Sequence, residues 1–151
     1  MNNLPIPAPE ALSHSQRLQQ VLSDELTSAG GWLSFARFME QLLYAPGLGY
    51  YTAGARKFGA AGDFVTAPEM TALFGQALAR QVAQIMAASV PVVLEVGAGS
   101  GRLAADLLLA LEKANALPER YFILDLSADL CQRQQETIGA AVPHLLSRVA
   151  W

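Results

Sequence analysis

Acidic residues and glycines are spaced along one stretch of the sequence in a way that suits ligand binding. The apolar run at 90–96 carries Glu95 near its end, and glycines follow at positions 97, 99 and 101. A glycine turn after a buried strand lets a ligand approach the backbone closely, and its N–H groups face that ligand. Asp125 ends the next apolar run, 24 residues after Gly101. This is close to the spacing of about 20 at which an acid accepts hydrogen bonds from ribose hydroxyls, so we predict a ligand site at the carboxyl edge of adjacent strands.

Three kinds of glycine loop compete for this pattern. A phosphate-binding P-loop requires a lysine after its last glycine, and no lysine follows here. The dinucleotide fingerprint needs its third glycine at position 102, where Arg102 would obstruct the close packing of helix on strand. The remaining pattern, acid-x-Gly-x-Gly-x-Gly, resembles motif I of class I methyltransferases that use S-adenosylmethionine (SAM). SAM carries a sulfonium and an amino group but no phosphate, so nearby acids favour its binding and lysines do not.

The candidate cofactor residues have separate predicted roles. Glu95 would orient the loop and the amino end of the methionine portion, the glycines would let the ligand pass, and Asp125 would hold the ribose. The full set comprises Glu95, Gly97, Ala98, Gly99, Gly101, Asp125, Leu126 and Asp63. Simpler interpretations stay open: the glycines can serve the turn alone, Asp125 can cap the segment that Ser127 opens, and Asp63 can satisfy a turn. Neither a catalytic base nor a metal site can be identified from the sequence.

The elements that must position these residues follow an α/β pattern. Short apolar runs at 90–96 and 120–127 predict buried parallel strands, and 146–151 resembles the start of a third. Helical periodicity predicts a helix after Gly101 and another over 128–139. Strand, helix, strand, helix, strand is the repeat of a doubly wound α/β fold.

The sequence before the first strand predicts three further helices. The first has apolar residues at helical spacing from Leu18 and ends at a pair of glycines, and Ser34 can cap the second. The third would run from 66 to 88, opened by a capping box of Thr66 and Glu69.

We therefore expect an α/β fold with a partial Rossmann-like (class I methyltransferase) parallel sheet and an N-terminal helical extension. Residues 1–65 would form the extension, and 66–151 the N-terminal part of a SAM-binding domain. Two strands and the start of a third are fewer than such sheets normally contain, and they would leave an apolar edge and uncovered faces. We expect that the chain is a fragment or that another chain completes the sheet, and a homo-oligomer stays open.

Composition argues against several classes of partner. The 151 residues include 10 Lys plus Arg against 13 Asp plus Glu and no basic run, so nucleic acid is not expected as a principal partner. No stretch approaches the roughly 18 uninterrupted apolar residues of a membrane span, and the N-terminus lacks the pattern of a signal or transit peptide. The single cysteine, Cys131, cannot form an intrachain disulfide and fits a reducing compartment.

A second block of sequence narrows the resemblance to one family. Residues 38–79, which contain GDFVTAPE, have no place in a generic methyltransferase. Together with LEVGAGSGRLAADLL at 94–108 and YFILDLSADLCQRQ at 121–134, they resemble the MidA-like family of SAM-dependent methyltransferases over residues 33–151. That family includes bacterial proteins and a mitochondrial protein that assists assembly of respiratory complex I.

The resemblance implies more than the residues alone. It implies a seven-stranded Rossmann-like core, SAM as cofactor, methylation of a protein arginine linked to respiratory complex assembly, and a bacterial cytoplasmic location. Family members are much longer, so the substrate-side residues are expected beyond residue 151. Asp125 departs from the glutamate that is commoner in the family.

Two other functions stay open beside a SAM-dependent enzyme that acts by SN2 methyl transfer to a protein nitrogen. One is a non-catalytic interaction module whose nucleotide site is unused or degenerate. The other is an NAD-binding domain.

Overall fold

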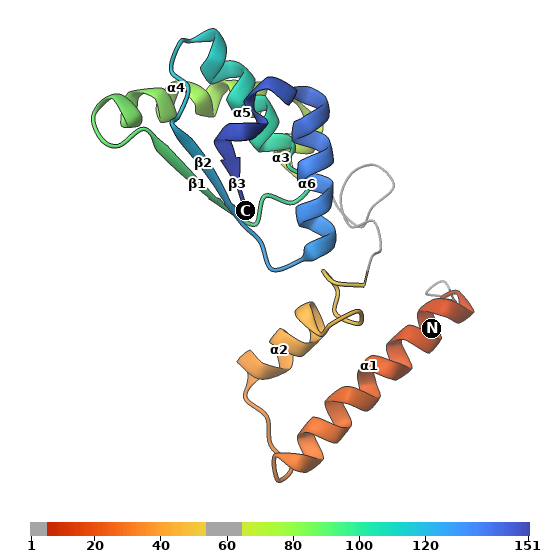
Figure 1. Ribbon diagram of the computed structural model, residues 1–151. Helices are drawn as coiled ribbons and strands as arrows, with labels where there is room; N and C mark the ends of the chain where they lie inside the picture. Colours follow the sequence, from red (N-terminus) through yellow and green to blue (C-terminus); the bar gives the residue numbers. More distant parts are fainter. Residues whose placement is uncertain (1–5, 54–64) are drawn as a thin grey trace. The chain divides into compact units, whose positions relative to one another are not determined.

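The computed structural model describes residues 6–53 and 65–151 (Figure 1). The chain divides into two compact units, Met1–Ala55 and Arg56–Trp151. The candidate residue Asp63 lies outside the described residues. None of the helices in the described ranges has the length and apolar character needed to cross a lipid bilayer.

Two helices form the first unit. α1 spans Pro9–Ser28 and begins with a proline, which the first turn tolerates because its N–H groups have no intrahelical partner. α2 spans Phe35–Tyr44, and the Ser34 hydroxyl caps it as predicted by accepting the Arg37 N–H at 3.2 Å. The Arg37 guanidinium donates to Glu25 of α1 at 2.5 Å, so an ion pair joins the two helices.

The second unit contains the predicted α/β repeat. In chain order it comprises α3 (Ala67–Met70), α4 (Leu73–Ala87), β1 (Val92–Val96), α5 (Arg102–Lys113), β2 (Arg120–Leu124), α6 (Ala128–Ala141), the 3-10 helix η1 (Pro143–Arg148) and β3 (Val149–Ala150). The strands form a parallel sheet in the order β1-β2-β3, with Glu95 opposite Ile123 and Tyr121 opposite Val149. The predicted α/β fold, with a partial parallel sheet and an N-terminal helical extension, is confirmed.

The region after Thr66 differs from the prediction. The sequence predicts one helix from a capping box to residue 88, whereas the structure has two helices separated at Thr71 and Ala72. The Thr66 side chain makes no cap hydrogen bond, and the chain is extended again at Thr71. The Thr71 hydroxyl accepts the Leu73 N–H at 3.2 Å, so a side-chain bond supports the start of α4 instead. The Glu69 carboxylate accepts a hydrogen bond from Ser100 and does not complete a capping box.

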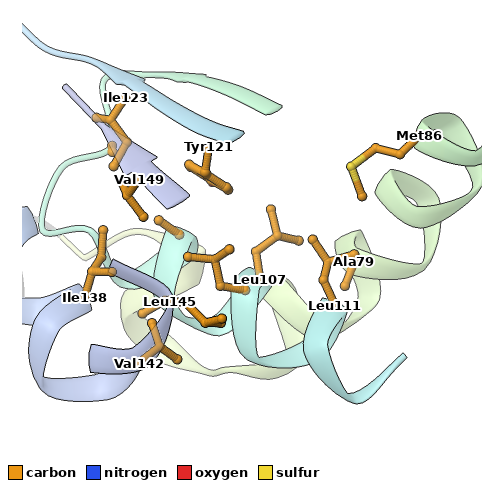
Figure 2. Packing of buried hydrophobic residues seen from close by; sticks show 14 residues of the cluster. Ala79, Met86, Leu107, Leu111, Tyr121, Ile123, Ile138, Val142, Leu145 and Val149 are labelled. Carbon is orange, nitrogen blue, oxygen red and sulfur yellow. The ribbon is translucent and has the colours of Figure 1, made fainter. Parts of the chain in front are cut away.

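One face of the sheet carries the hydrophobic core (Figure 2). Tyr121, Ile123 and Val149 point from the strands toward the helices and are at most 8% exposed. Residues of α4, α5 and α6 pack against them, including Ala79, Met86, Leu107, Leu108, Leu111 and Ile138. Alternate residues of a strand point to opposite faces, so the residues next to these three in each strand lie on the other face of the sheet.

The opposite face of the sheet is apolar and open among the described residues. Leu94 and Val96 of β1 are 63% and 69% exposed, and Leu124 of β2 is 56% exposed. Val92 and Phe122 share this face and are also exposed. Parallel sheets are usually covered on both faces, which is why their strands read as continuous apolar runs.

Candidate ligand site at the glycine loop

The loop after β1 has the backbone conformation that its glycines predict. Gly97, Gly99 and Gly101 have φ of 69°, 57° and 82°, a left-handed region that residues with a side chain rarely adopt. The Gly97 N–H donates to the Leu124 carbonyl at 2.8 Å and so extends the pairing of β1 with β2 by one residue. The loop then turns into α5 at the carboxyl edge of the sheet, where ligands bind in open α/β folds.

The first and third glycines of the loop differ in their surroundings. A Cβ added at Gly97 would meet no heavy atom within 4 Å, so the backbone there faces open space. A Cβ added at Gly101 would lie 2.8 Å from the Cα of Gln134 and 3.2 Å from its Cβ. Gly97 therefore leaves room for a ligand, whereas Gly101 permits the close approach of α6.

Glu95 lies beside the loop on the covered face of the sheet. Its Oε2 accepts a hydrogen bond of 2.7 Å from the hydroxyl of Tyr121, which is 1% exposed. Partial burial raises the pKa of the Glu95 carboxyl above its ordinary value, and the Tyr121 hydrogen bond opposes that rise. Burial also raises the pKa of Tyr121, which keeps its hydroxyl protonated as the donor.

A cavity of about 220 Å³ brings Glu95 and the loop together with α3. Its lining comprises Thr66, Pro68, Glu69, Glu95, Gly97, Ala98, Gly99, Ser100, Arg102 and Leu103. Glu69 is attached to the loop through the Ser100 hydroxyl, and Arg102 is paired with Asp106 at 2.9 Å. Two carboxylates therefore line the cavity, and the cation among its described lining residues, Arg102, already has an acidic partner.

Asp125 follows β2 and does not line this cavity. One carboxylate oxygen accepts the Ser127 N–H at 3.0 Å, and the other accepts the Gln134 side-chain amide at 2.8 Å. The Ser127 hydroxyl caps α6 by accepting the Leu130 N–H at 3.3 Å. The bond from the Ser127 N–H is consistent with the simpler interpretation, in which Asp125 serves the start of α6. However, a carboxylate has about four acceptor sites, so both oxygens can accept further hydrogen bonds.

The other candidates take different positions. Ala98 is buried in the loop and belongs to the hydrophobic core, although it also lines the cavity. Leu126 is 73% exposed beside Asp125, where a flat apolar ligand group could lie against it. In the described ranges, no group of three or more His, Cys, Asp or Glu is arranged to hold a metal ion.

Sequence reasoning missed two residues that contact the site. Glu69 was assigned to a helix cap in preference to a role beside the ligand, and its link to Ser100 joins residues 31 positions apart. Gln134 is 0% exposed and bonds both Asp125 and the Gly99 carbonyl. Its signal was present in the sequence, because it lies between Leu130 and Ile138 at helical spacing and interrupts a buried apolar stripe.

A larger cavity of about 410 Å³ lies between α4 and α5. Alanines make up half of its lining, and Gln76, Arg80, Asp106 and Lys113 are its polar residues. No strand or glycine-loop residue lines it. The smaller cavity is the better candidate, because Glu95 of β1 and the glycine loop line it at the carboxyl edge of the sheet.

Comparison with known proteins agrees with this geometry. Residues 77–151 match a family described as "Putative S-adenosyl-L-methionine-dependent methyltransferase". A curated relative from Caenorhabditis elegans, the mitochondrial "Protein arginine methyltransferase NDUFAF7 homolog", is 30% identical over 138 residues, which are 87% of this chain and 32% of the relative. The Danio rerio protein arginine methyltransferase NDUFAF7 is 39% identical over 84 residues, which are 53% of this chain and 20% of that protein.

Two solved structures from Burkholderia thailandensis share the fold. A crystal structure bound to S-adenosyl-homocysteine has a TM-score of 0.91 and 52% identity over 99% of this chain and 40% of that one. A native structure has a TM-score of 0.85 and 50% identity over 99% of this chain and 38% of that one. This chain thus spans about a third or less of the curated relatives it matches, and two fifths or less of the solved ones.

The parallel sheet and the glycine loop after its first strand define an α/β fold of the class I methyltransferase type. Within that class, the chain belongs to the MidA-like family of SAM-dependent methyltransferases.

Proposed function

We propose that this chain binds SAM at the glycine loop and forms part of a SAM-dependent methyltransferase. The observation that carries the proposal is the S-adenosyl-homocysteine-bound Burkholderia structure, which is 52% identical over 99% of this chain. The open backbone at Gly97 supports it, because a ligand can reach the loop there without meeting a side chain.

The charges around the cavity also support a cationic ligand. SAM carries an ammonium, a sulfonium and a carboxylate, which give it a net charge of about +1 at neutral pH. Glu69 and Glu95 line the cavity, and Arg102 is neutralised by Asp106. The two glutamates would hold the amino end of the ligand, and the Arg102 guanidinium would lie near its carboxylate.

The size of the cavity indicates which part of the ligand enters it. Its volume of about 220 Å³ is below the roughly 300 Å³ at which sites for whole small molecules begin. We infer that the methionine portion occupies the cavity and that the adenosine lies outside it. There the ribose would bond to Asp125 and the adenine would lie on Leu126.

The proposed reaction transfers a methyl group to a protein arginine. Bound SAM supplies an electrophilic methyl group on a sulfonium. The role of this chain would be to fix the direction of that group, since SN2 transfer depends chiefly on alignment of the reacting atoms. Arginine is proposed because two relatives are named protein arginine methyltransferases, and the family resemblance adds a link to respiratory complex assembly and a bacterial cytoplasmic location.

Isothermal titration calorimetry of the 151-residue chain with SAM and with S-adenosyl-homocysteine tests the proposal. We expect one site for either ligand. If neither SAM nor S-adenosyl-homocysteine binds, the cofactor assignment is contradicted and a non-catalytic module is favoured. An increase in NADH fluorescence that SAM cannot reverse would instead favour the NAD-binding alternative.

The orientation of the ligand has a sharper test. 5′-Methylthioadenosine has the adenosine and the sulfur of S-adenosyl-homocysteine but no amino-acid portion. We expect Glu69→Gln to weaken S-adenosyl-homocysteine about tenfold, the loss of one charged hydrogen bond, and to leave 5′-methylthioadenosine unchanged. Asp125→Asn is the matched control and should weaken both ligands. Equal losses for both ligands in Glu69→Gln would contradict the proposed orientation.

A further inference from the structure

The side chain of Gln134 connects three separate parts of the second unit. It lies in the middle of α6 and is 0% exposed. Its Nε2 donates to Asp125 Oδ2 at 2.8 Å and to the Gly99 carbonyl at 3.2 Å, and its Oε1 accepts the Trp151 indole N–H at 2.9 Å. Both amide protons and the amide oxygen are therefore used, as the burial of a polar group requires.

The arrangement of these bonds fixes the amide in one orientation. Asp125 and the Gly99 carbonyl are acceptors, so both need the NH₂ group, whereas the Trp151 N–H needs the amide oxygen. The opposite orientation would place the oxygen against the Asp125 carboxylate. The amide therefore has a unique set of partners, two of which belong to the proposed ligand site.

The backbone of α6 brings this amide within reach of the loop. The Cα of Gln134 lies so close to Gly101 that an alanine there would contact it at 2.8 Å. The third glycine of the loop thus allows the approach, and Gln134 then bonds the carbonyl of the second glycine, Gly99. The same side chain holds the Asp125 carboxylate from one side while the Ser127 N–H holds it from another.

We propose that Gln134 is a positioning residue that sets the Asp125 carboxylate and the glycine loop at the separation that one adenosyl ligand requires. The proposal rests on the proposed function, because it assigns both groups to the same ligand. Gln134 does not line the cavity and acts through its two partners. A glutamate would oppose Asp125 with a like charge, and a hydrocarbon would leave the carboxylate and the Gly99 carbonyl without this donor.

A double-mutant cycle tests this role. S-adenosyl-homocysteine binding is measured by calorimetry for the wild-type chain, Gln134→Met, Asp125→Asn and the double variant. We expect Gln134→Met, which keeps the length of the side chain, to weaken binding about tenfold, as the loss of a hydrogen bond to a charged group does. The loss of affinity in the double variant should be smaller than the sum of the two single losses, because Gln134 and Asp125 share one contact and residues in contact are not additive.

Trp151→Phe provides the matched control. It removes the third hydrogen bond of Gln134 and leaves those to Asp125 and Gly99 in place. Affinity for S-adenosyl-homocysteine should therefore stay within about twofold of wild type, which is the deviation expected between independent sites. Melting temperatures are recorded for every variant. If Gln134→Met melts earlier but binds S-adenosyl-homocysteine within twofold of wild type, or if its loss simply adds to that of Asp125→Asn, the proposal is overturned.

Two further outcomes are distinguishable. If Gln134→Met does not fold, Gln134→Asn keeps an amide in the core but is one methylene too short to reach both partners, and the same loss of affinity is expected. Wild-type affinity in Gln134→Asn would overturn the proposal. If the wild-type chain itself binds neither S-adenosyl-homocysteine nor SAM, the proposed function fails, and the positioning role fails with it.

Discussion

The two faces of the sheet differ in what covers them, although their residues are similar. On β2, Ile123 points into the core and is 3% exposed, whereas its neighbour Leu124 is 56% exposed on the opposite face. On β1, Glu95 faces the helices, and its neighbours Leu94 and Val96 lie on the open face. Apolar residues at successive positions of a strand thus indicate a parallel sheet, but they do not show which face the described helices cover.

The candidate site depends on the covered face. Glu95 receives its hydrogen bond from Tyr121 on that face, and α6, which holds Asp125 through Gln134, packs there too. The glycine loop enters α5, whose residues fill the same core. Changes on the covered face should therefore affect stability and ligand binding, and changes on the open face should affect neither strongly.

The largest effect is expected for Ile123→Ala. Removal of a buried isoleucine side chain leaves a cavity and should lower the free energy of unfolding by about 2–5 kcal/mol. Leu124→Ala, one residue along the same strand, is the control and should cost less than about 1 kcal/mol, the span of β-propensities. Urea unfolding followed by Trp151 fluorescence in a Trp32→Phe background measures both. Equal losses would show that the open face is covered in solution.

A smaller effect should separate Gly101 from Gly97. Gly101→Ala places a Cβ at positive φ and 2.8 Å from the Gln134 Cα, and the strain and overpacking should cost about 2–4 kcal/mol. Gly97→Ala shares only the positive φ, so about 1–2 kcal/mol is expected from urea unfolding. Affinity for S-adenosyl-homocysteine should fall more in Gly97→Ala than in Gly101→Ala, because a Cβ at Gly97 enters the space proposed for the ligand. If Gly101→Ala is no costlier than Gly97→Ala, α6 does not approach as described.

The parts of the fold that the sequence predicted are those with local causes. The caps at Ser34 and Ser127 were predictable because each hydroxyl bonds an N–H three residues ahead. The glycine loop was predictable because glycines at alternate positions after an apolar run indicate a turn with positive φ. The 3-10 helix η1 gave no periodic signal and was missed.

The parts that could not be predicted have causes distant in the chain. Thr66 and Glu69 match a capping box, but Ser100 takes the Glu69 carboxylate from 31 residues away. Gln134 finds its loop partner 35 residues away. The third glycine was assigned to the ligand, and only the approach of α6 shows that Gly101 also serves packing. Local patterns therefore located the site, whereas the connections that hold it depend on the tertiary fold.

The smallest predicted effect, and the one that varies with pH, concerns Tyr121→Phe. The Glu95 carboxyl has a raised pKa in the folded chain, so the folded state loses stability as the pH rises from the ordinary pKa of a glutamate through the folded value. Loss of the Tyr121 hydroxyl raises the pKa of Glu95 further, which enlarges that loss and extends it to higher pH. We expect a cost of about 1.5 kcal/mol at pH 7, the value of a hydrogen bond to a charged group, and a smaller cost near pH 4. Urea unfolding from pH 4 to 8 measures the trend, and in a Glu95→Gln background the same substitution should have a cost independent of pH. If the cost of Tyr121→Phe does not change with pH while Glu95 is present, the assigned pairing is contradicted. The Tyr121 hydroxyl should stabilise the folded state more at higher pH, because it then donates to an ionised Glu95.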